Sequence, residues 1–242
     1  MRPIWPSVSS EPMPTAHRQR RPLRRRAPAR PADPARVSRI LSALAQANPV
    51  PRVELQYRSP FQLLLATILS AQCTDQRVNQ VTPGLFRRYP TPGDCAHAEQ
   101  AELERLIKST GFFKSKARNI IGCCRALIER FGGDVPDTME ALVSLPGVGR
   151  KTANVVLGNC FGKPAVIVDT HVKRVAQRLG LTASDDPDRI EEDLQRFMPS
   201  DEWAAGSQRL LLHGRYVCVA RLPKCRDCPI DRLCHWKGKT PR

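Results

Sequence analysis

The chain has 242 residues, a formal net charge of +16 at pH 7 and 26% charged side chains. Residues 1–30 hold eight arginines and one glutamate, and the remaining residues still carry 31 basic and 22 acidic side chains. A positive charge of this size favours a polyanionic partner, of which DNA and RNA are the commonest. No apolar run is long enough to cross a membrane and no segment alternates as β-strands do, so we expect an all-α protein without a membrane partner.

The first 33 residues form a basic extension rich in proline, serine and arginine, without apolar periodicity. Such a composition predicts disorder. The extension lacks a continuous apolar segment and is therefore not a secretory signal. A nucleic-acid-binding arm, a targeting peptide and a dispensable extension remain as alternatives. Because the prolines disfavour the amphipathic helix of a mitochondrial presequence, we favour the arm or the extension.

Apolar spacing then predicts helices almost without interruption. The first covers 34–48, and Ser59-Pro60 begins the second because proline is well tolerated at the first helical position. The polar run 70–75 interrupts this core-facing helix and opens the next, which ends near Phe86. Further helices are expected at 99–109, 114–131, 137–144, 150–160, 171–179, 188–197 and 202–213. Glycines expected to end helices are Gly111, Gly132, Gly133 and Gly180.

The stretch 145–149, Leu-Pro-Gly-Val-Gly, cannot continue a helix because of its proline and two glycines. Thr138 is a suitable N-cap for the helix before it. The pattern predicts a helix, a tight glycine hairpin and a second helix. Backbone N–H groups at such a helix start suit one phosphate and read no base edge, which predicts binding without sequence preference. An ordinary glycine-capped connection between helices is the alternative.

Two chemically active side chains follow this hairpin. Lys151 lies in the first helical turn, where the helix dipole disfavours a cation and helps the amine to lose its proton. Only the neutral amine can attack a carbon, although most surface lysines are simply solvated. Asp169 directly precedes the helix expected at 171–179, so its ordinary role is that of an N-cap. A carboxylate can cap a helix and take part in chemistry at the same time.

Nine cysteines divide into two groups. Cys124 and Cys160 fall on apolar helix faces and are expected to behave as small buried hydrophobic residues. A disulfide framework is not expected without a secretory signal. Four others lie within seventeen residues in the pattern C-x6-C-x2-C-x5-C, and residue chemistry allows either tetrahedral zinc or a cubane iron–sulfur cluster on them. They leave no open position for a substrate, so the centre is expected to be structural; its ligands are Cys218, Cys225, Cys228 and Cys234.

LPGVGRKTANVV followed by VDTHVKRV resembles the helix-hairpin-helix superfamily of DNA glycosylases, and within it the endonuclease III family. The likeness runs from about Ser59 to Cys234. It implies a bifunctional N-glycosylase and AP lyase that excises oxidised pyrimidines from duplex DNA and cuts 3′ to the abasic site by β-elimination. Lys151 would attack the sugar C1′ to form a Schiff base, and Asp169 would assist. The cysteine spacing matches the family's [4Fe–4S] loop at all four positions, so the resemblance favours that cluster over zinc.

The resemblance also implies DNA contacts. The glutamine of the SAQ-x-T-D motif, Gln72, would fill the space left by an extruded base; without the resemblance it would be a capping or surface residue. In the turn 110–114, Phe112 stands where the family has an apolar wedge between bases, whereas Phe113 is suited to the core. The hairpin contacts to the DNA backbone are expected from Leu145, Gly147, Val148, Gly149 and Arg150.

For architecture, the resemblance implies two lobes: a six-helix barrel at 53–163 with the hairpin, and an iron–sulfur domain combining 34–52 with 164–242. We expect a monomer acting on double-stranded DNA that contains damaged bases or abasic sites, in the cytoplasm and nucleoid of a bacterium or in a eukaryotic mitochondrion or nucleus. Adenine glycosylases are the nearest alternative, but they typically have serine at the position of Lys151 and an acid at that of Ile68. A non-catalytic DNA-binding module is the alternative from another class.

Overall fold

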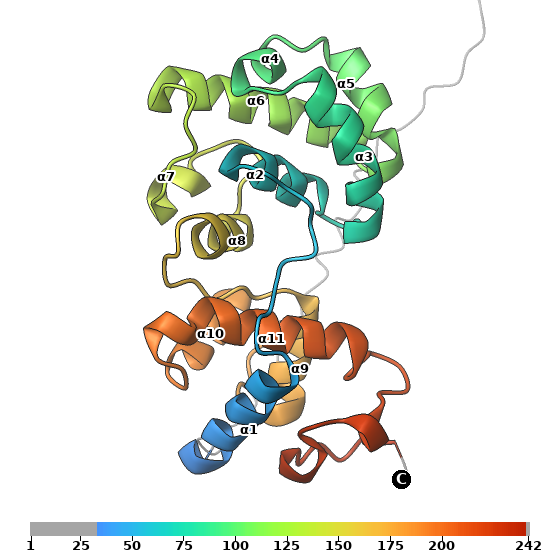
Figure 1. Cartoon of the computed structure of the whole chain (residues 1–242), viewed down its shortest axis with the longest axis vertical. Helices are drawn as coiled ribbons and strands as arrows, with labels where there is room; N and C mark the ends of the chain where they lie inside the picture. The colour runs from blue at the N-terminus through green and yellow to red at the C-terminus, as the bar shows by residue number, and fades with distance from the viewer. Residues whose placement is uncertain (1–32, 241–242) are drawn as a thin grey trace, which may run out of the picture.

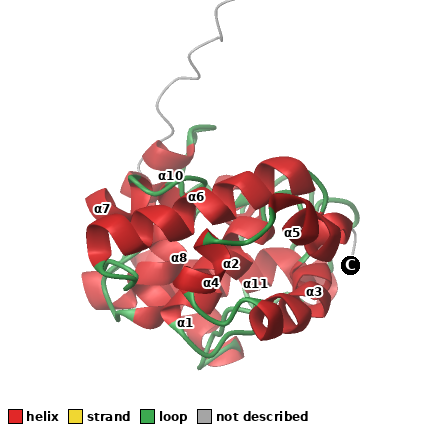
Figure 2. Cartoon of the chain, turned by 90° about the horizontal axis from the view of Figure 1, so that it is seen from above, coloured by secondary structure: helices red, strands yellow, loops and turns green. Residues whose placement is uncertain are grey.

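The computed structural model describes residues 33–240, and within this range it consists of helices and loops with no strand (Figures 1 and 2). The all-α prediction is confirmed, and the basic extension lies outside the described residues except for Asp33. No helix of the described range is long and apolar enough to cross a membrane. The α-helices are α1 (Pro34–Ala47), α2 (Pro60–Leu69), α3 (Asp75–Arg88), α4 (Pro92–Ala96), α5 (Gln100–Ile107), α6 (Phe113–Phe131), α7 (Met139–Val143), α8 (Arg150–Cys160), α9 (Thr170–Leu179), α10 (Pro187–Gln195) and α11 (Trp203–Tyr216).

Local side-chain chemistry explains most helix ends. Ser59 Oγ accepts a hydrogen bond from the Gln62 N–H at 3.2 Å, with Pro60 in the first position of α2. Thr138 caps α7 in the same way. Gly132 and Gly180 end α6 and α9 with φ angles of 64° and 69°, a left-handed conformation that costs glycine little. The predicted caps at these positions are confirmed.

Two features of the fold differ from the sequence prediction. Helix α4 was not predicted, because its five residues are too few to show a period; its signal is the capping box of Thr91 and Asp94. Helix α11 continues to Tyr216, past Gly214, where glycine would ordinarily suggest an end. A Cβ on Gly214 would lie 2.9 Å from the Cβ of His171, so this glycine allows α9 and α11 to pack closely inside a continuous helix.

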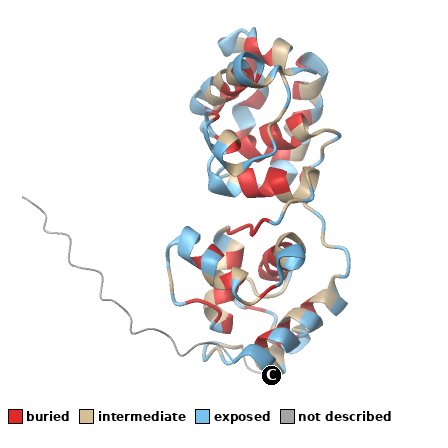
Figure 3. Cartoon of the chain, turned by 90° about the vertical axis from the view of Figure 1, so that its left-hand side faces the viewer, coloured by how far each residue is buried: buried red, intermediate tan, exposed pale blue. Residues whose placement is uncertain are grey.

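The helices fall into two groups that are stacked along the long axis of the molecule (Figure 1). In the first group α6 packs on α4 and α5, and α2 packs on α8. In the second, α11 packs on α9 and α1, and the C-terminal cysteine loop lies at the far end. The chain passes between the groups in the segments 48–59 and 161–169. Buried residues lie inside both groups and also in the second connection, at 165–168 (Figure 3).

The second connection is fixed from both sides. Asn154 of α8 donates its Nδ2 hydrogen bond to the Val166 carbonyl at 2.8 Å, and the Ile167 N–H donates to Ser207 Oγ of α11 at 3.0 Å. These bonds satisfy a buried extended backbone that has no sheet partner. They also fix the start of α9, which carries Asp169, relative to α8, which carries Lys151.

The candidate active site and DNA interface

The hairpin between α7 and α8 is shaped by buried apolar anchors and one obligatory glycine. The side chains of Leu145 and Val148 are buried, and the Val148 N–H donates to the Leu145 carbonyl at 3.1 Å. Gly147 has a φ of 77°, and an added Cβ would lie 2.7 Å from the Asn119 Cβ on α6. Leu145 and Val148 therefore hold the turn from inside, and Gly147 is required both by its backbone angle and by its packing.

The start of α8 presents unpaired backbone donors. Among residues 33–240, the N–H groups of Gly149, Arg150 and Lys151 have no backbone acceptor. An added Cβ on Gly149 would meet nothing within 4 Å, so the approach to these donors is open. Unpaired N–H groups together with the positive end of an eleven-residue helix form a site suited to a phosphate.

Lys151 occupies the second position of α8 and is exposed. Within the described range its amine takes part in no hydrogen bond or ion pair with other residues. Arg150 beside it is, by contrast, paired with a carboxylate. The amine next to the anion site is thus available to a substrate.

Asp169 caps α9 with only one of its two carboxylate oxygens. Its Oδ1 accepts hydrogen bonds from the His171 and Val172 N–H groups, both at 2.8 Å, whereas Oδ2 accepts none in the described part of the chain. The side chain is half-buried. The predicted N-cap is confirmed, and the second oxygen is left for other chemistry. Lys151 and Asp169 form no ion pair with each other in residues 33–240.

The Arg150 side chain joins the two groups of helices. Its Nε and Nη2 donate to the two carboxylate oxygens of Glu191 on α10 at 2.8 and 2.9 Å. The Glu191 side chain is only 6% exposed, and Asn154 Nδ2 donates to the same carboxylate at 3.2 Å. Sequence reasoning missed Glu191. Its signal was a charged residue beside Ile190 on the buried face of α10, where charged side chains need a partner.

Gln72 and Phe112 share an unusual backbone. Both are exposed, Phe112 by 64%, and they have φ angles of 52° and 46°. In the described range, Leu222 is the other non-glycine residue with positive φ. This left-handed conformation is costly for residues with a side chain and is concentrated at functional sites. Phe113 packs against the core, in agreement with its predicted role.

The cysteine loop brings its four predicted ligands to one pocket. Cys218, Cys225, Cys228 and Cys234 line this pocket with apolar side chains, and none forms a disulfide. Burial, and to a smaller extent the other three sulfurs, raises the pKa of Cys228 to about 11. Arg178 of α9 donates to the Cys218 sulfur at 3.2 Å. In residues 33–240 no three potential ligands converge as a single metal ion requires.

The donor set suits a cluster held by four thiolates, because Arg178 donates to one of the sulfurs and apolar side chains such as Val175, Leu179 and Ile230 line the pocket beside them. The loop also exposes four basic side chains: Arg221, Lys224, Arg226 and Arg232. Of the other cysteines with a predicted location, Cys124 is buried as expected, whereas Cys160 is only half-buried at the end of α8.

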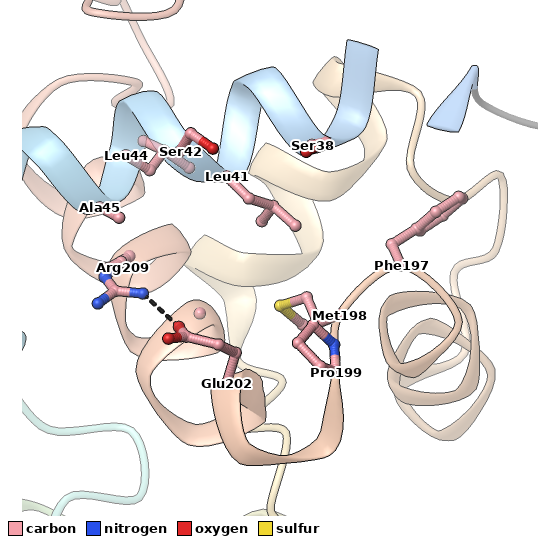
Figure 4. Close-up of a pocket in the computed structure, with 11 residues that line it drawn as sticks. Ser38, Leu41, Ser42, Leu44, Ala45, Phe197, Met198, Pro199, Glu202 and Arg209 are labelled. Carbon is pink, nitrogen blue, oxygen red and sulfur yellow. Dashed lines mark hydrogen bonds and ion pairs between the residues drawn. The ribbon is translucent and has the colours of Figure 1, made fainter. Parts of the chain in front are cut away.

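A separate pocket of about 270 Å³ lies between α1 and the start of α11 (Figure 4). Neither Lys151 nor Asp169 lines it. Its charged side chains, Arg209 and Glu202, already pair with each other at 2.6 Å. This pocket is therefore not part of the candidate active site.

Comparisons with known proteins identify the family to which this fold belongs. Residues 65–200 match the model of the HhH-GPD superfamily base excision DNA repair protein. The endonuclease III of Synechocystis sp. is 54% identical over 200 residues, which cover 82% of this chain and 91% of that protein. A solved endonuclease III in a non-covalent complex with DNA matches with a TM-score of 0.81 and 45% identity, covering 84% of this chain and 95% of that one.

A second solved structure is a trapped covalent endonuclease III–DNA intermediate, with the same TM-score and identity, covering 84% of this chain and 96% of that one. The family-model match over residues 65–200 includes the hairpin and helices of both groups. The chain belongs to the endonuclease III family of the helix-hairpin-helix superfamily of base excision DNA repair proteins.

Proposed function

We propose that Lys151 is the amine with which this base excision repair enzyme, a DNA glycosylase with AP lyase activity, attacks the damaged nucleotide. The observation that carries this assignment is an exposed, unpaired amine in the first turn of α8, beside backbone donors suited to a phosphate. The trapped covalent intermediate of the similar endonuclease III supports an enzyme nucleophile. In this chain Lys151 is the residue whose position and chemistry fit that role.

In the proposed reaction the neutral Nζ of Lys151 bonds to C1′, and the bond from C1′ to the base breaks with its electron pair leaving on the base. Asp169 Oδ2 accepts the lysine proton, directly or through a water molecule, and its charge stabilises the developing positive charge on the sugar. The C1′–O4′ bond of the sugar then breaks, O4′ takes the proton that Asp169 had accepted, and C1′ and Nζ are left as an iminium that acidifies the C2′ proton. Loss of that proton expels the 3′ phosphate by β-elimination, which cuts the strand 3′ to the lesion.

DNA is held through its backbone and opened by two wedges. The N–H groups of Gly149 and Arg150 would bind one phosphate, while the Arg150 guanidinium remains with Glu191. Gly149, with open space beside it, would let the DNA backbone approach closely, while Gly147 and the buried Leu145 and Val148 would keep the hairpin in shape. Gln72 and Phe112 would occupy the stack after the damaged nucleotide rotates out. We propose oxidised pyrimidines as substrates, since damaged bases cost less to extrude than intact ones.

The cysteine loop would hold a [4Fe–4S] cluster through Cys218, Cys225, Cys228 and Cys234. When bound, such a group would tie the loop into one shape and would not take part in bond cleavage. The exposed basic side chains of the loop could then meet further phosphates. In this proposal 53–163 forms the barrel lobe and 34–52 with 164–242 forms the cluster lobe. We further propose that the enzyme works as a monomer on nucleoid DNA in the cytoplasm.

Borohydride trapping on duplex DNA containing an abasic site or one oxidised pyrimidine tests the assignment. The wild-type protein should be captured covalently, and Lys151→Ala should give no adduct. Lys173→Ala is the matched control, because it removes a first-turn lysine of α9 that is already paired with Asp185 at 3.0 Å. Undiminished capture of Lys151→Ala would refute the nucleophile, and failure of the wild-type protein to be captured would indicate a non-catalytic binding module.

Asp169 is tested by two substitutions that separate its roles. Asp169→Asn keeps an oxygen able to cap α9 but removes the carboxylate, so excision should fall while thermal stability stays close to that of the wild type. Asp169→Ala should lose both excision and about 1 kcal/mol of stability. Equal excision by wild type and Asp169→Asn would limit Asp169 to capping.

A further inference from the structure

Lys116 is a buried ammonium whose observed hydrogen bonds go to backbone carbonyls. Its side chain lies on α6, the residue is 4% exposed, and its pKa is lowered by burial. Nζ donates to the Leu69 carbonyl at 2.7 Å and to the Thr110 carbonyl at 2.8 Å. Among residues 33–240 it has no ion-pair partner. Burying a charge without a carboxylate is costly, which calls for a reason beyond packing.

The two acceptors stand immediately before the two wedge segments. Leu69 ends α2, three residues before Gln72, and Thr110 ends the short 3-10 helix Lys108–Thr110, two residues before Phe112. One nitrogen bonds both carbonyls, so the two oxygens lie no more than about 5.5 Å apart. Lys116 thus ties together two segments that are distant in sequence.

Each tied segment then enters the left-handed conformation. Gln72 and Phe112 keep positive φ angles while their side chains are exposed. A strained backbone persists only where its surroundings hold it. The Leu69 and Thr110 residues that precede them are buried, and the shared ammonium satisfies their carbonyls where water cannot.

We propose that Lys116 is a positioning residue that sets the spacing of Gln72 and Phe112, so that both side chains enter the DNA stack together. This inference rests on the wedge roles given above. Lys116 itself is too deeply buried to contact DNA. Without the ammonium, two buried carbonyls lose their partner, and the two segments separate or turn to reach water.

The test compares a step that needs the wedges with one that does not. Single-turnover excision of an oxidised pyrimidine from duplex DNA requires extrusion, whereas borohydride capture on a single-stranded abasic oligonucleotide has no partner base to replace. Lys116→Met should slow duplex excision by about tenfold, the scale of one lost stacking contact, and should leave single-stranded capture within about twofold. Lys114→Met, which removes the same charge from an exposed position of α6, should slow excision by less than about threefold.

A second arm repeats Lys116→Met in a protein carrying Gln72→Ala and Phe112→Ala. With both wedges gone, the further loss should be less than about twofold, because the effects are not independent. A further loss of about tenfold in duplex excision in this background would overturn the positioning role. Equal losses of activity on duplex and single-stranded DNA would overturn it as well. If Gln72→Ala and Phe112→Ala do not slow duplex excision, the wedge roles themselves fail and the inference falls with them.

Lys116→Arg keeps the experiment decisive if Lys116→Met does not fold. Arginine retains the charge and offers two or more donors, but it places them further along a planar group. It should therefore slow duplex excision less than Lys116→Met and again spare single-stranded capture. A selective loss on single-stranded DNA would contradict the inference.

Discussion

Replacing Arg150 by methionine measures how much the Arg150–Glu191 ion pair between the two groups of helices contributes to stability. The change removes donors at 2.8 and 2.9 Å and leaves the buried Glu191 carboxylate with amide donors only. Losing one partner of a buried ion pair costs about 3–5 kcal/mol. Arg150 is half-exposed, so we expect the lower end, about 3 kcal/mol, or a melting temperature lower by about 6–12 °C in a chain of this size.

Removing the charge of Glu191 instead of Arg150 should cost less stability. Glu191→Gln leaves the half-exposed guanidinium to water, at a cost of about 1–2 kcal/mol. Thermal unfolding followed by far-ultraviolet circular dichroism measures both variants, and Arg150→Met combined with Glu191→Met should recover most of the loss because no buried charge remains. The reasoning is refuted if Arg150→Met is no more damaging than Glu191→Gln, or if the double variant is the least stable.

Arg150→Met also tests whether the Arg150 guanidinium stays with Glu191 or contacts a DNA phosphate. If the guanidinium stays with Glu191, the slope of log affinity against log salt should be the same for Arg150→Met as for the wild type. A side-chain contact to one phosphate would instead reduce that slope by about 0.9.

Gly147→Ala should destabilise the protein by about 2 kcal/mol or more in thermal melts, because the φ of Gly147 is positive and the new Cβ meets α6. Gly149→Ala should leave the stability of the protein unchanged but weaken DNA binding in titrations, because the new methyl group blocks the phosphate site. Phe112→Gly should be about 1 kcal/mol more stable than Phe112→Ala, since glycine removes the left-handed strain, and similar melting temperatures would argue against that strain. Cys234→Ala should abolish brown colour and bound iron, and Cys160→Ala should retain both; a colourless wild-type protein containing zinc would contradict the iron–sulfur assignment.

Sequence predicted the helices well where their ends depend on neighbouring residues. The caps at Ser59, Thr138 and Asp169 are local chemistry, because each oxygen bonds an N–H two or three residues ahead. Helix α4 has such a cap but no periodicity, and apolar spacing alone could not find it. The end of α11 depends on how closely Gly214 approaches α9, a distance that no local pattern contains.

The candidate site shows the same contrast between features set by neighbouring residues and features set by packing between helices. The hairpin, Lys151 and Asp169 could be proposed from motifs because a few adjacent residues carry them. Glu191 lies 41 residues from Arg150, and the Leu69 carbonyl lies 47 residues from Lys116. Such partners are set by packing between helices, so the sequence shows that a charge is present but not which atom will meet it.

Adjacent basic residues at the start of α8 have different fates, and this difference explains why the amine stays available. A planar guanidinium matches a carboxylate with two parallel bonds, which a single ammonium cannot do. Arg150 therefore occupies both oxygens of Glu191, a buried acid of α10. If Glu191 instead met Lys151, the proposed nucleophile would be held as one half of a salt bridge. By satisfying that acid, Arg150 joins the two groups of helices, and Asp169, whose Oδ2 carries no protein bond in the described residues, keeps the role that we propose for it beside Lys151.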